Sequence, residues 1–447
     1  MKISVTSERT DDGKVAAKVT VPAAEVDATV KKTYRDIAQR YNFQGFRRGR
    51  APRPVIDGIL GKDAVLAQAT DELLQEIQPQ MIEELDLVPV ERPDWGESDP
   101  VVEHEDFVID CTVVVPPVAG LKSYDAPAIN MPPAEVTEAE IDHQIEQLLT
   151  YRTTFEPNKR AKKVKAKDMI TVTAVDKKGE SGIAGEDRSV ALGNPNLAKE
   201  LVSGIVGMKV GETKTISWTH SHDDHTHEFE VEVTINNIQK AVTPKLTDEF
   251  AKTGFGFDTV AELRDAVKEE VAADKKEGLP GLKEDRVVAA IGEQLDLEEV
   301  PEAYQNQVFN ELAQEFLGQL SRRGMNLDMY LSMQGIKSDE FLADLHDQAE
   351  ERARQSLALD ALANELKLDC SDEDIRSEFK KANVKDVDSS IKEFLSDGRM
   401  PAVRQSIRRT KAVNWLVDNA QVTEVDEVAE ARAKDEGNKD EASEDAE

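Results

Sequence analysis

The chain is poor in cysteine, in aromatic residues and in long apolar segments. Its 447 residues include two cysteines, Cys111 and Cys370, and only 5% are Phe, Trp or Tyr. The cysteines lie far apart and form no CxxC motif, so we expect no disulfide framework and a reducing compartment. No segment approaches about 18 consecutive apolar residues, and residues 1–15 contain no apolar signal core. We therefore expect a cytoplasmic protein that makes no membrane contact.

Motifs for nucleophilic catalysis and for nucleotide binding are also missing. The sequence contains no G-x-S-x-G motif, no phosphate-binding loop and no cysteine–histidine pair at a catalytic spacing. We therefore expect no cofactor and no bound nucleotide. An apolar fraction of 39% beside a charged fraction of 32% is low for one compact core, so we expect several domains.

The charge of the chain is strongly negative, with one local exception. Lys and Arg number 56 against 89 Asp and Glu, a formal net charge of −33, which excludes general coating of nucleic acid. Residues 45–53 nevertheless carry four arginines: Arg47, Arg48, Arg50 and Arg53. Gly45 and Gly49 permit a tight bend there, and Pro52 fixes the entry into the next helix. The alternative to a functional loop is a solvated turn between two helices.

A cationic loop on an anionic protein indicates an anionic target that the rest of the surface would repel. Structured RNA fits this description, because arginine binds phosphate with two parallel hydrogen bonds and stacks on bases.

Hydrophobic periodicity predicts an α+β domain over residues 1–117. Strands at 2–8 and 14–21 form a hairpin around Asp11-Asp12-Gly13, and a strand at 105–115 returns to their sheet. Helical stretches flank the arginine loop, and Cys111 falls on the apolar face of the last strand.

The rest of the chain divides into a connector, a β-rich domain, a helical domain and a tail. Residues 118–161 hold a proline-rich linker and a helix at 134–152, which we expect to pack with the C-terminal helices. A basic run follows that includes Arg160, Lys162, Lys163 and Lys165. We favour its interpretation as a solvated connector over a second RNA contact. Residues 162–243 predict an inserted β-rich domain. For residues 244–425 the pattern predicts an all-α domain, with helices at 258–277, 282–296, 301–323, 338–367, 371–382, 387–396 and 400–419. For residues 426–447 the composition predicts a disordered acidic tail.

Three motifs resemble the bacterial trigger factor family. Gly45-Phe46-Arg47-Arg48-Gly49 with Pro52 is similar to the family's loop signature, and Leu246-Thr247-Asp248-Glu249-Phe250 to the start of its C-terminal domain. The turn Gly-Met-Lys-Val-Gly-Glu at 207–212 resembles that of an FKBP-type peptidyl-prolyl isomerase domain. The resemblance covers nearly the whole chain. It implies a multidomain α+β protein with a ribosome-binding domain, an inserted FKBP-like domain and an all-α C-terminal domain.

The resemblance also implies a function. Members are bacterial, ATP-independent chaperones that dock on the large ribosomal subunit, against protein and rRNA at the tunnel exit, and shelter nascent and unfolded polypeptides. The residues implied in ribosome binding are Gly45, Phe46, Arg47, Arg48, Gly49, Arg50 and Pro52. Whether the protein forms a homodimer away from the ribosome is left open by the sequence. Two alternative functions are also left open: a dedicated prolyl isomerase, and a non-catalytic ribosome-assembly or RNA-binding factor that would not bind unfolded polypeptide.

The isomerase-like domain departs from the family pattern where the proline-binding groove is expected. A prolyl isomerase lowers the rotation barrier of an amide by binding its twisted form among apolar and aromatic side chains. Here Val-Thr-Ala-Val at 172–175 replaces an aromatic strand, and Ala198-Lys199-Glu200-Leu201 replaces an Ile-Pro-Gly-Phe-like floor. We therefore expect weak or absent activity and assign no catalytic residue. The groove candidates are Leu197, Leu201, Ile205 and Val231.

Four histidines cluster at the expected flap of this domain: His220, His222, His225 and His227. Neutral imidazole is a common ligand of Zn²⁺, Ni²⁺ and Cu²⁺, so the spacing makes a candidate metal site. A polar hairpin also accumulates histidines without any ligand, and we predict no bound metal.

The C-terminal helices carry a wide apolar face in a chain with few aromatic residues to cover it. Methionine-rich surfaces adapt to varied partners because the side chain is unbranched and polarizable. We therefore expect client polypeptides to bind there, against the alternative of an ordinary core. The candidate client-binding residues are Val308, Leu312, Phe316, Met329 and Met333.

Overall fold

The computed structural model describes residues 1–10, 13–158, 160–166, 168–179, 181–194, 197–222 and 225–434, without the side chains of 220–222 and 225–228. The chain forms two compact units. The first contains residues 1–130 and 280–423, and the second contains residues 131–279 and the chain from 424 onward. Within the described ranges, no helix combines the length and the apolar character needed to cross a membrane.

The first unit begins with a four-stranded sheet of order β1-β2-β4-β3. Its strands are β1 (Ser4–Arg9), β2 (Lys14–Val21), β3 (Asp94–Trp95) and β4 (Phe107–Val114). Along β2 and β4 every second side chain is buried, as the alternation predicts. The hairpin and the returning strand are therefore confirmed; the Asp11-Asp12 part of the predicted turn lies outside the described residues.

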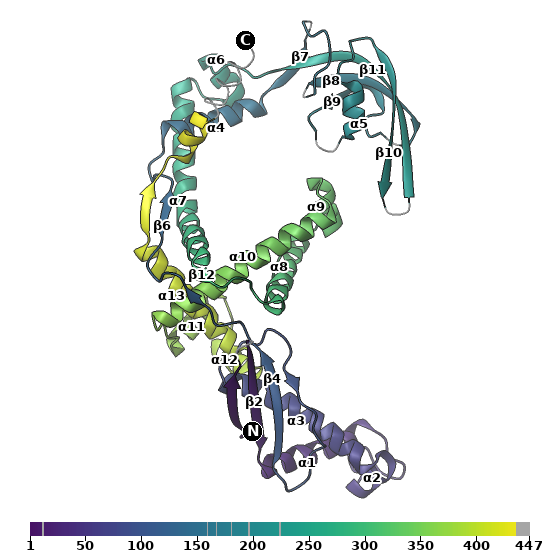
Figure 1. The fold of residues 1–447 in the computed structure, drawn as a ribbon, viewed down its shortest axis with the longest axis vertical. Helices are drawn as coiled ribbons and strands as arrows, with labels where there is room; N and C mark the ends of the chain where they lie inside the picture. Colours follow the sequence, from purple (N-terminus) through teal and green to yellow (C-terminus); the bar gives the residue numbers. More distant parts are fainter. Residues whose placement is uncertain are drawn as a thin grey trace. The chain divides into compact units, whose positions relative to one another are not determined.

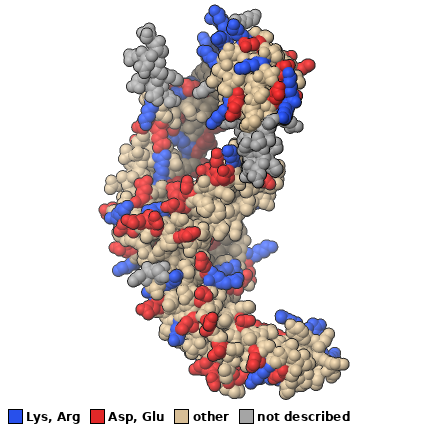
Figure 2. Space-filling view, turned by 45° about the vertical axis from the view of Figure 1, so that its right-hand side comes forward, with Lys and Arg blue, Asp and Glu red and all other residues tan. Residues whose placement is uncertain are grey.

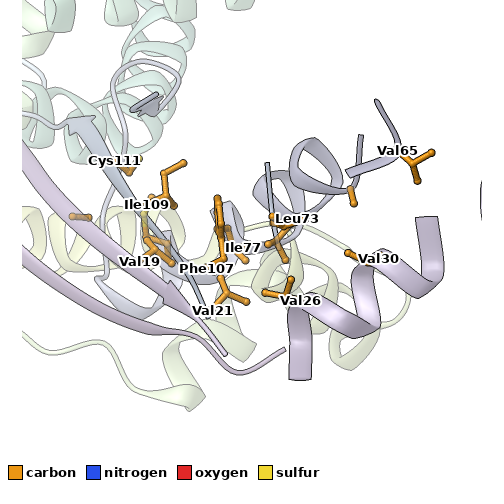
Figure 3. Packing of buried hydrophobic residues seen from close by; sticks show 14 of the residues in the cluster. Val19, Val21, Val26, Val30, Val65, Leu73, Ile77, Phe107, Ile109 and Cys111 are labelled. Atoms are coloured by element: carbon orange, nitrogen blue, oxygen red, sulfur yellow. The ribbon is translucent and has the colours of Figure 1, made fainter. Parts of the chain in front are cut away.

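Three helices accompany this sheet: α1 (Ala23–Arg40), α2 (Arg53–Leu60) and α3 (Lys62–Glu84). Figure 3 shows Val26 and Val30 of α1 and Leu73 and Ile77 of α3 packed in the same core as the sheet residues. Cys111 lies in this core, and its burial raises the pKa of the thiol to about 12, so it stays protonated. The prediction that Cys111 is a core residue is confirmed.

The helices of residues 302–419 complete the first unit (Figure 1). They are α8 (Glu302–Arg322), α9 (Leu327–Gln334), α10 (Ser338–Glu365), α11 (Asp372–Lys381), α12 (Val387–Ser396) and α13 (Met400–Asn419). The sequence missed α9, which is short but starts and ends with strong signals. The Asn326 side chain caps its N-terminus, and Gly335 ends it in a left-handed conformation.

Short strands occupy part of the predicted linker. β5 (Gly120–Leu121) pairs with β12 (Leu295–Asp296), and β6 (Ala128–Met131) pairs with β13 (Gln421–Glu424). The linker is extended as predicted, and each strand pair satisfies backbone groups that proline-rich segments often leave to water.

A single helix, α7 (Val260–Glu293), replaces the two predicted at 258–277 and 282–296. The predicted break is wrong, because Pro280 lies inside the helix. A proline within a helix removes one backbone hydrogen bond and favours a kink, but it need not end a helix that continues on both sides.

In the second unit, α4 (Glu138–Tyr151) packs with the first turns of α7 and with the π-helix η1 (Ala251–Phe255), which follows the short helix α6 (Asp248–Phe250). Two basic residues of α7 bind acidic residues of α4. Lys275 contacts Glu140 at 2.6 Å with little solvent exposure, and Arg264 contacts Glu138 and Asp142. These ion pairs hold α4 against α7.

Residues 427–434, which the sequence assigned to a disordered tail, are helical in the structure. Arg432 binds Glu146 of α4 at 2.7 Å and lies 3.7 Å from Asp142. This ion pair between distant segments is not visible in local composition. Residues 435–447 lie outside the described residues.

The inserted domain is a five-stranded sheet of order β10-β11-β8-β9, with β7 paired to β11. Its strands are β7 (Thr154–Pro157), β8 (Met169–Lys178), β9 (Gly185–Ala191), β10 (Thr213–His222) and β11 (His225–Val242). The helix α5 (Lys199–Ile205) packs against it. Because β7 belongs to this sheet, the domain starts earlier than the predicted residue 162. Its two ends meet, since the Thr153 and Thr243 hydroxyls lie 2.9 Å apart.

Inside the first unit, the turn between α12 and α13 packs against α3. Arg404 binds Glu83 at 2.9 Å and Asp86 at 2.8 Å. Beside these ion pairs, Gly398 adopts φ +68°, and a Cβ there would lie 2.9 Å from Cα of Pro79. The close approach therefore requires glycine for both conformation and space.

We predict that Gly398→Ala destabilises this contact more than Gly324→Ala destabilises its own turn. Gly324 has φ +70° but nothing within 4 Å of its Cβ position, so both variants incur a left-handed strain of about 1–2 kcal/mol. Only Gly398→Ala also forces two backbones apart, which adds about 1–3 kcal/mol. Hydrogen exchange of α3 and α13 amides measures the difference, and equal exchange in the two variants would contradict the close packing.

Candidate functional site

The arginine loop, residues 41–52, connects α1 to α2 and is held by its own backbone. Phe43 is buried at 5% exposure and anchors the loop in the sheet-domain core. Gly49 donates its N–H to the Ala38 carbonyl at 2.8 Å, and Phe46 and Arg50 donate theirs to Phe43 and Arg47. Gly45 and Gly49 have φ of +85° and +80°, as their predicted role in the bend requires.

The tip of the loop presents Phe46, Arg47, Arg48 and Arg50 to solvent, and Pro52 leads directly into α2. Phe46 is 43% exposed. Arg48 donates to the Gln39 carbonyl at 2.6 Å, which orients the side chain but leaves its charge unneutralised. Among the described residues, no acidic side chain forms an ion pair with Arg47, Arg48 or Arg50. The loop thus presents three cations and one aromatic ring together.

Arg53 differs from the other three arginines because it is committed inside the domain. It binds Glu103 at 2.7 Å, and its guanidinium lies 4.5 Å from the centre of the Tyr34 ring. The Tyr34 hydroxyl donates to Asp57 at 2.6 Å. Burial raises the pKa of Tyr34, and the bond to Asp57 raises it further, so the hydroxyl remains a donor. This network fixes α2 against α1.

Two apolar side chains of α2 extend the exposed surface beyond the loop. Ile59 is 62% exposed and Leu60 is 39% exposed. Gly61 ends α2 with φ +86°, and α3 begins at Lys62. Ile59 therefore lies in the last turn of α2, where its side chain faces solvent.

The groove candidates of the inserted domain are mostly interior. Leu201, Ile205 and Val231 are at most 1% exposed and fill the core between α5 and the sheet, while Leu197 is half-buried against it. Ala174 is also buried. These side chains can support a groove from below but do not line an open one.

An aromatic pair that the sequence analysis did not single out lies at one end of this core. Trp218 of β10 and Phe229 of β11 stand directly opposite in the hairpin register and stack with ring centres 5.2 Å apart and planes 6° apart. They line a cavity of about 350 Å³ together with Lys178, Ser217, Thr219 and Glu230. The missed signal was alternation, since Trp218 follows buried Ile216 by two residues and Phe229 precedes buried Val231 by two.

The backbone of the proposed histidine flap forms the ends of β10 and β11. The side chains of His220, His222, His225 and His227 lie outside the described residues. In the part of the chain with described side chains, no group of three or more His, Cys, Asp or Glu residues could hold a metal ion.

The candidate client-binding residues separate into core and surface. Val308 is buried at 5% exposure on α8, which packs against α10. Leu312 and Phe316 are half-buried, whereas Met329 and Met333 are 51% and 72% exposed.

An aromatic cluster supports the exposed methionines. Phe316 of α8 lies with its ring centre 5.1 Å from those of both Tyr330 and Phe341. These contacts hold α9 against α8 and α10. Leu317 and Leu342, which the sequence analysis did not select, are 48% and 43% exposed on the same helices. The exposed apolar surface is thus carried by Leu317, Met329, Met333 and Leu342.

Two family models match most of the chain. The model described as "Bacterial trigger factor protein (TF)" matches residues 1–148, and "Bacterial trigger factor protein (TF) C-terminus" matches residues 259–418. These segments contain the arginine loop and the methionine-bearing helices, and the inserted domain lies between them.

Curated proteins named trigger factor align along nearly their whole length. The one from Lysinibacillus sphaericus is 28% identical over 91% of this chain and 96% of its own. That of Corynebacterium aurimucosum is 28% identical over 94% of each chain, and that of Staphylococcus carnosus 25% identical over 97% and 100%. A solved chain titled "Promiscuous Substrate Recognition in Folding and Assembly Activities of the Trigger Factor Chaperone" aligns with 93% of this chain and 99% of its own, at 17% identity and a TM-score of 0.35. From the two family models and the full-length relatives together, the chain belongs to the bacterial trigger factor family.

Proposed function

We propose that the chain is a ribosome-associated, ATP-independent chaperone that binds nascent polypeptides. The observation that carries the proposal is the loop at 41–52 on a protein of net charge −33. The loop presents Phe46 beside three arginines that form no ion pair within the part of the chain that the structure describes. Figure 2 shows Asp and Glu spread widely over the face in view, so a polyanion would be repelled over most of it. The loop is a local exception, and its target is rRNA and protein of the large subunit at the tunnel exit. This function places the protein in the bacterial cytoplasm.

The apolar surface of α8, α9 and α10 supports the chaperone part of the proposal. Leu317, Met329, Met333 and Leu342 are exposed in one group of packed helices, where adaptable side chains suit clients of varied sequence. Client contacts there need no nucleotide, because apolar burial alone provides the driving force. Exposed apolar surface also allows a homodimer away from the ribosome.

A second activity, peptidyl-prolyl isomerisation, is supported by the stacked Trp218 and Phe229. Their rings offer an apolar wall for a proline ring beside an open cavity, but the other wall residues are polar: Lys178, Ser217, Thr219 and Glu230. Weak activity follows from a site that has one aromatic wall where a dedicated isomerase surrounds the twisted amide.

Phe46→Ala with Arg47→Ala and Arg48→Ala is expected to abolish ribosome cosedimentation while leaving the fold intact, because these side chains are exposed. Binding of the unmodified chain should weaken with salt, since phosphate contacts release counterions. Arg322→Ala with Arg323→Ala is the control, as both are exposed arginines outside the loop. Normal cosedimentation of the folded loop variant would refute the proposed docking site.

Excision of residues 154–242, with Thr153 and Thr243 joined by a short Gly-Ser linker, should leave aggregation suppression largely unchanged. The two threonines already touch, so the join requires little rearrangement. The measurement is light scattering of an unfolded client with and without the excised protein. Complete loss of suppression, in a variant that retains its helical circular dichroism, would move the client site into the inserted domain.

Turnover of short X-Pro peptides by the full chain should be weak, and Trp218→Ala or Phe229→Ala should reduce kcat/KM further. One lost aromatic contact of about 0.5–1.5 kcal/mol corresponds to roughly two- to tenfold in rate. Val175→Ala, at an exposed position of β8, is the control. A protease-coupled assay decides the matter, and activity that survives both aromatic substitutions would place the groove elsewhere.

A further inference from the structure

The basic segment, Asn158 together with residues 160–166, is fixed to the inserted domain at two points. Asn158 donates its N–H to the Ile238 carbonyl of β11 at 2.7 Å. Val164 is 2% exposed; it donates to the Met208 carbonyl and accepts from the Gly207 N–H, both at 2.9 Å. The segment is therefore part of the domain surface, which differs from the solvated connector that the sequence favoured.

Anchoring through Val164 directs the charged side chains outward. All four basic side chains of the segment are exposed: Arg160, Lys162, Lys163 and Lys165. The hydrogen bonds of Val164 with Gly207 and Met208 place exposed Lys209 next to the segment. In the described part of the chain, none of these five side chains forms an ion pair. Like charges on one short segment repel one another, so binding of an anion is favoured there.

Two carboxylates in the adjoining turns are already engaged by the backbone. Asp168 accepts the Lys165 N–H at 2.8 Å, and Glu212 accepts the Lys209 N–H at 2.9 Å. They order the two turns and soften the local positive charge without pairing with a lysine side chain. In Figure 2, Lys and Arg gather at the upper end of the domain that Figure 1 labels β7 to β11.

Exposed aromatic rings precede the segment. Phe155 of β7 is 46% exposed, and Tyr151 at the end of α4 is 87% exposed. Cations that follow a phosphate chain, with rings on which bases stack, are the combination that binds single-stranded nucleic acid. An acidic polypeptide would use the cations but would have no bases to stack on the rings.

We propose that the basic segment, together with Lys209, is an RNA-binding surface separate from the loop at 41–52. It adds a second RNA contact to the proposed ribosome association. This proposal can be tested with free RNA alone. A negative result for RNA binding would therefore be distinct from a negative result for ribosome docking.

The test uses the full chain carrying Phe46→Ala, Arg47→Ala and Arg48→Ala, so that the loop contributes no RNA contact. Binding of a labelled single-stranded RNA of about 20 nucleotides is followed by fluorescence anisotropy over a range of salt. Adding Lys162→Gln, Lys163→Gln and Lys165→Gln should weaken binding and reduce the slope of log K against log salt by about 2, at about 0.7 for each phosphate contact. The matched control is Lys268→Gln, Lys385→Gln and Lys392→Gln, which makes the same charge change at dispersed exposed sites.

Retained binding in the control, together with loss in the segment variant, supports the proposal. Equal weakening in both variants would attribute the effect to net charge and overturn it, as would failure of the loop variant to bind RNA at low salt. Displacement of the RNA by polyglutamate at equal charge would identify an acidic polypeptide as the partner instead. The arginine variant, Lys162→Arg with Lys163→Arg and Lys165→Arg, should bind RNA normally and guards against a folding defect in the glutamine variant. Ribosome cosedimentation of the segment variant with an intact loop reports on docking independently.

Discussion

The excess of carboxylates over basic side chains shapes both the contacts between helices and the charged surface of this protein. With 89 acidic residues against 56 basic ones, two of the contacts between helices are made where one arginine meets two carboxylates. Arg404 joins α13 to Glu83 and Asp86 at α3, and Arg264 joins α7 to Glu138 and Asp142 of α4. These pairs are partly exposed, so each contributes modestly by itself, and their removal would leave acidic clusters without a counter-charge.

Because carboxylates are in excess, cations without an ion-pair partner among the described residues are candidates for binding an external anion. The loop at 41–52 and the segment at 160–166 both carry several cations that pair with no carboxylate among the described residues. Their backbones are fixed by buried anchors, Phe43 in one and Val164 in the other. A fixed backbone with free cations reduces the entropy lost on binding an anion, and the negative remainder of the surface limits where the anion can bind. Arg53, tied to Glu103 and Tyr34, shows by contrast how an arginine of the same sequence cluster serves the fold alone.

Apolar surface follows a different rule, because it is set by how helices are covered. α8 buries Val308 against its neighbours but leaves Leu317 outside, and short α9 is held by Phe316, Tyr330 and Phe341 while Met329 and Met333 face solvent. The inserted domain has its own core between α5 and the sheet, with ends that meet at Thr153 and Thr243. It can therefore be placed within a helical chain without disturbing the backbone on either side.

The sequence by itself determined the class of the domains, the hairpin of β1 and β2, most of the C-terminal helices and the position of the arginine loop. These are local properties: alternation, helical periodicity, and glycines that must take positive φ. Tertiary structure decided the rest. Arg53 is paired with Glu103, while Arg47 and Arg50 form no ion pair among the described residues; α7 continues through Pro280, and residues 427–434 join α4 through Arg432. It also decided that Leu201, Ile205 and Val231 are core while Trp218 and Phe229 border a cavity. Burial and ion pairing depend on which segments, distant in the sequence, pack together in the fold. Local sequence patterns do not determine those contacts.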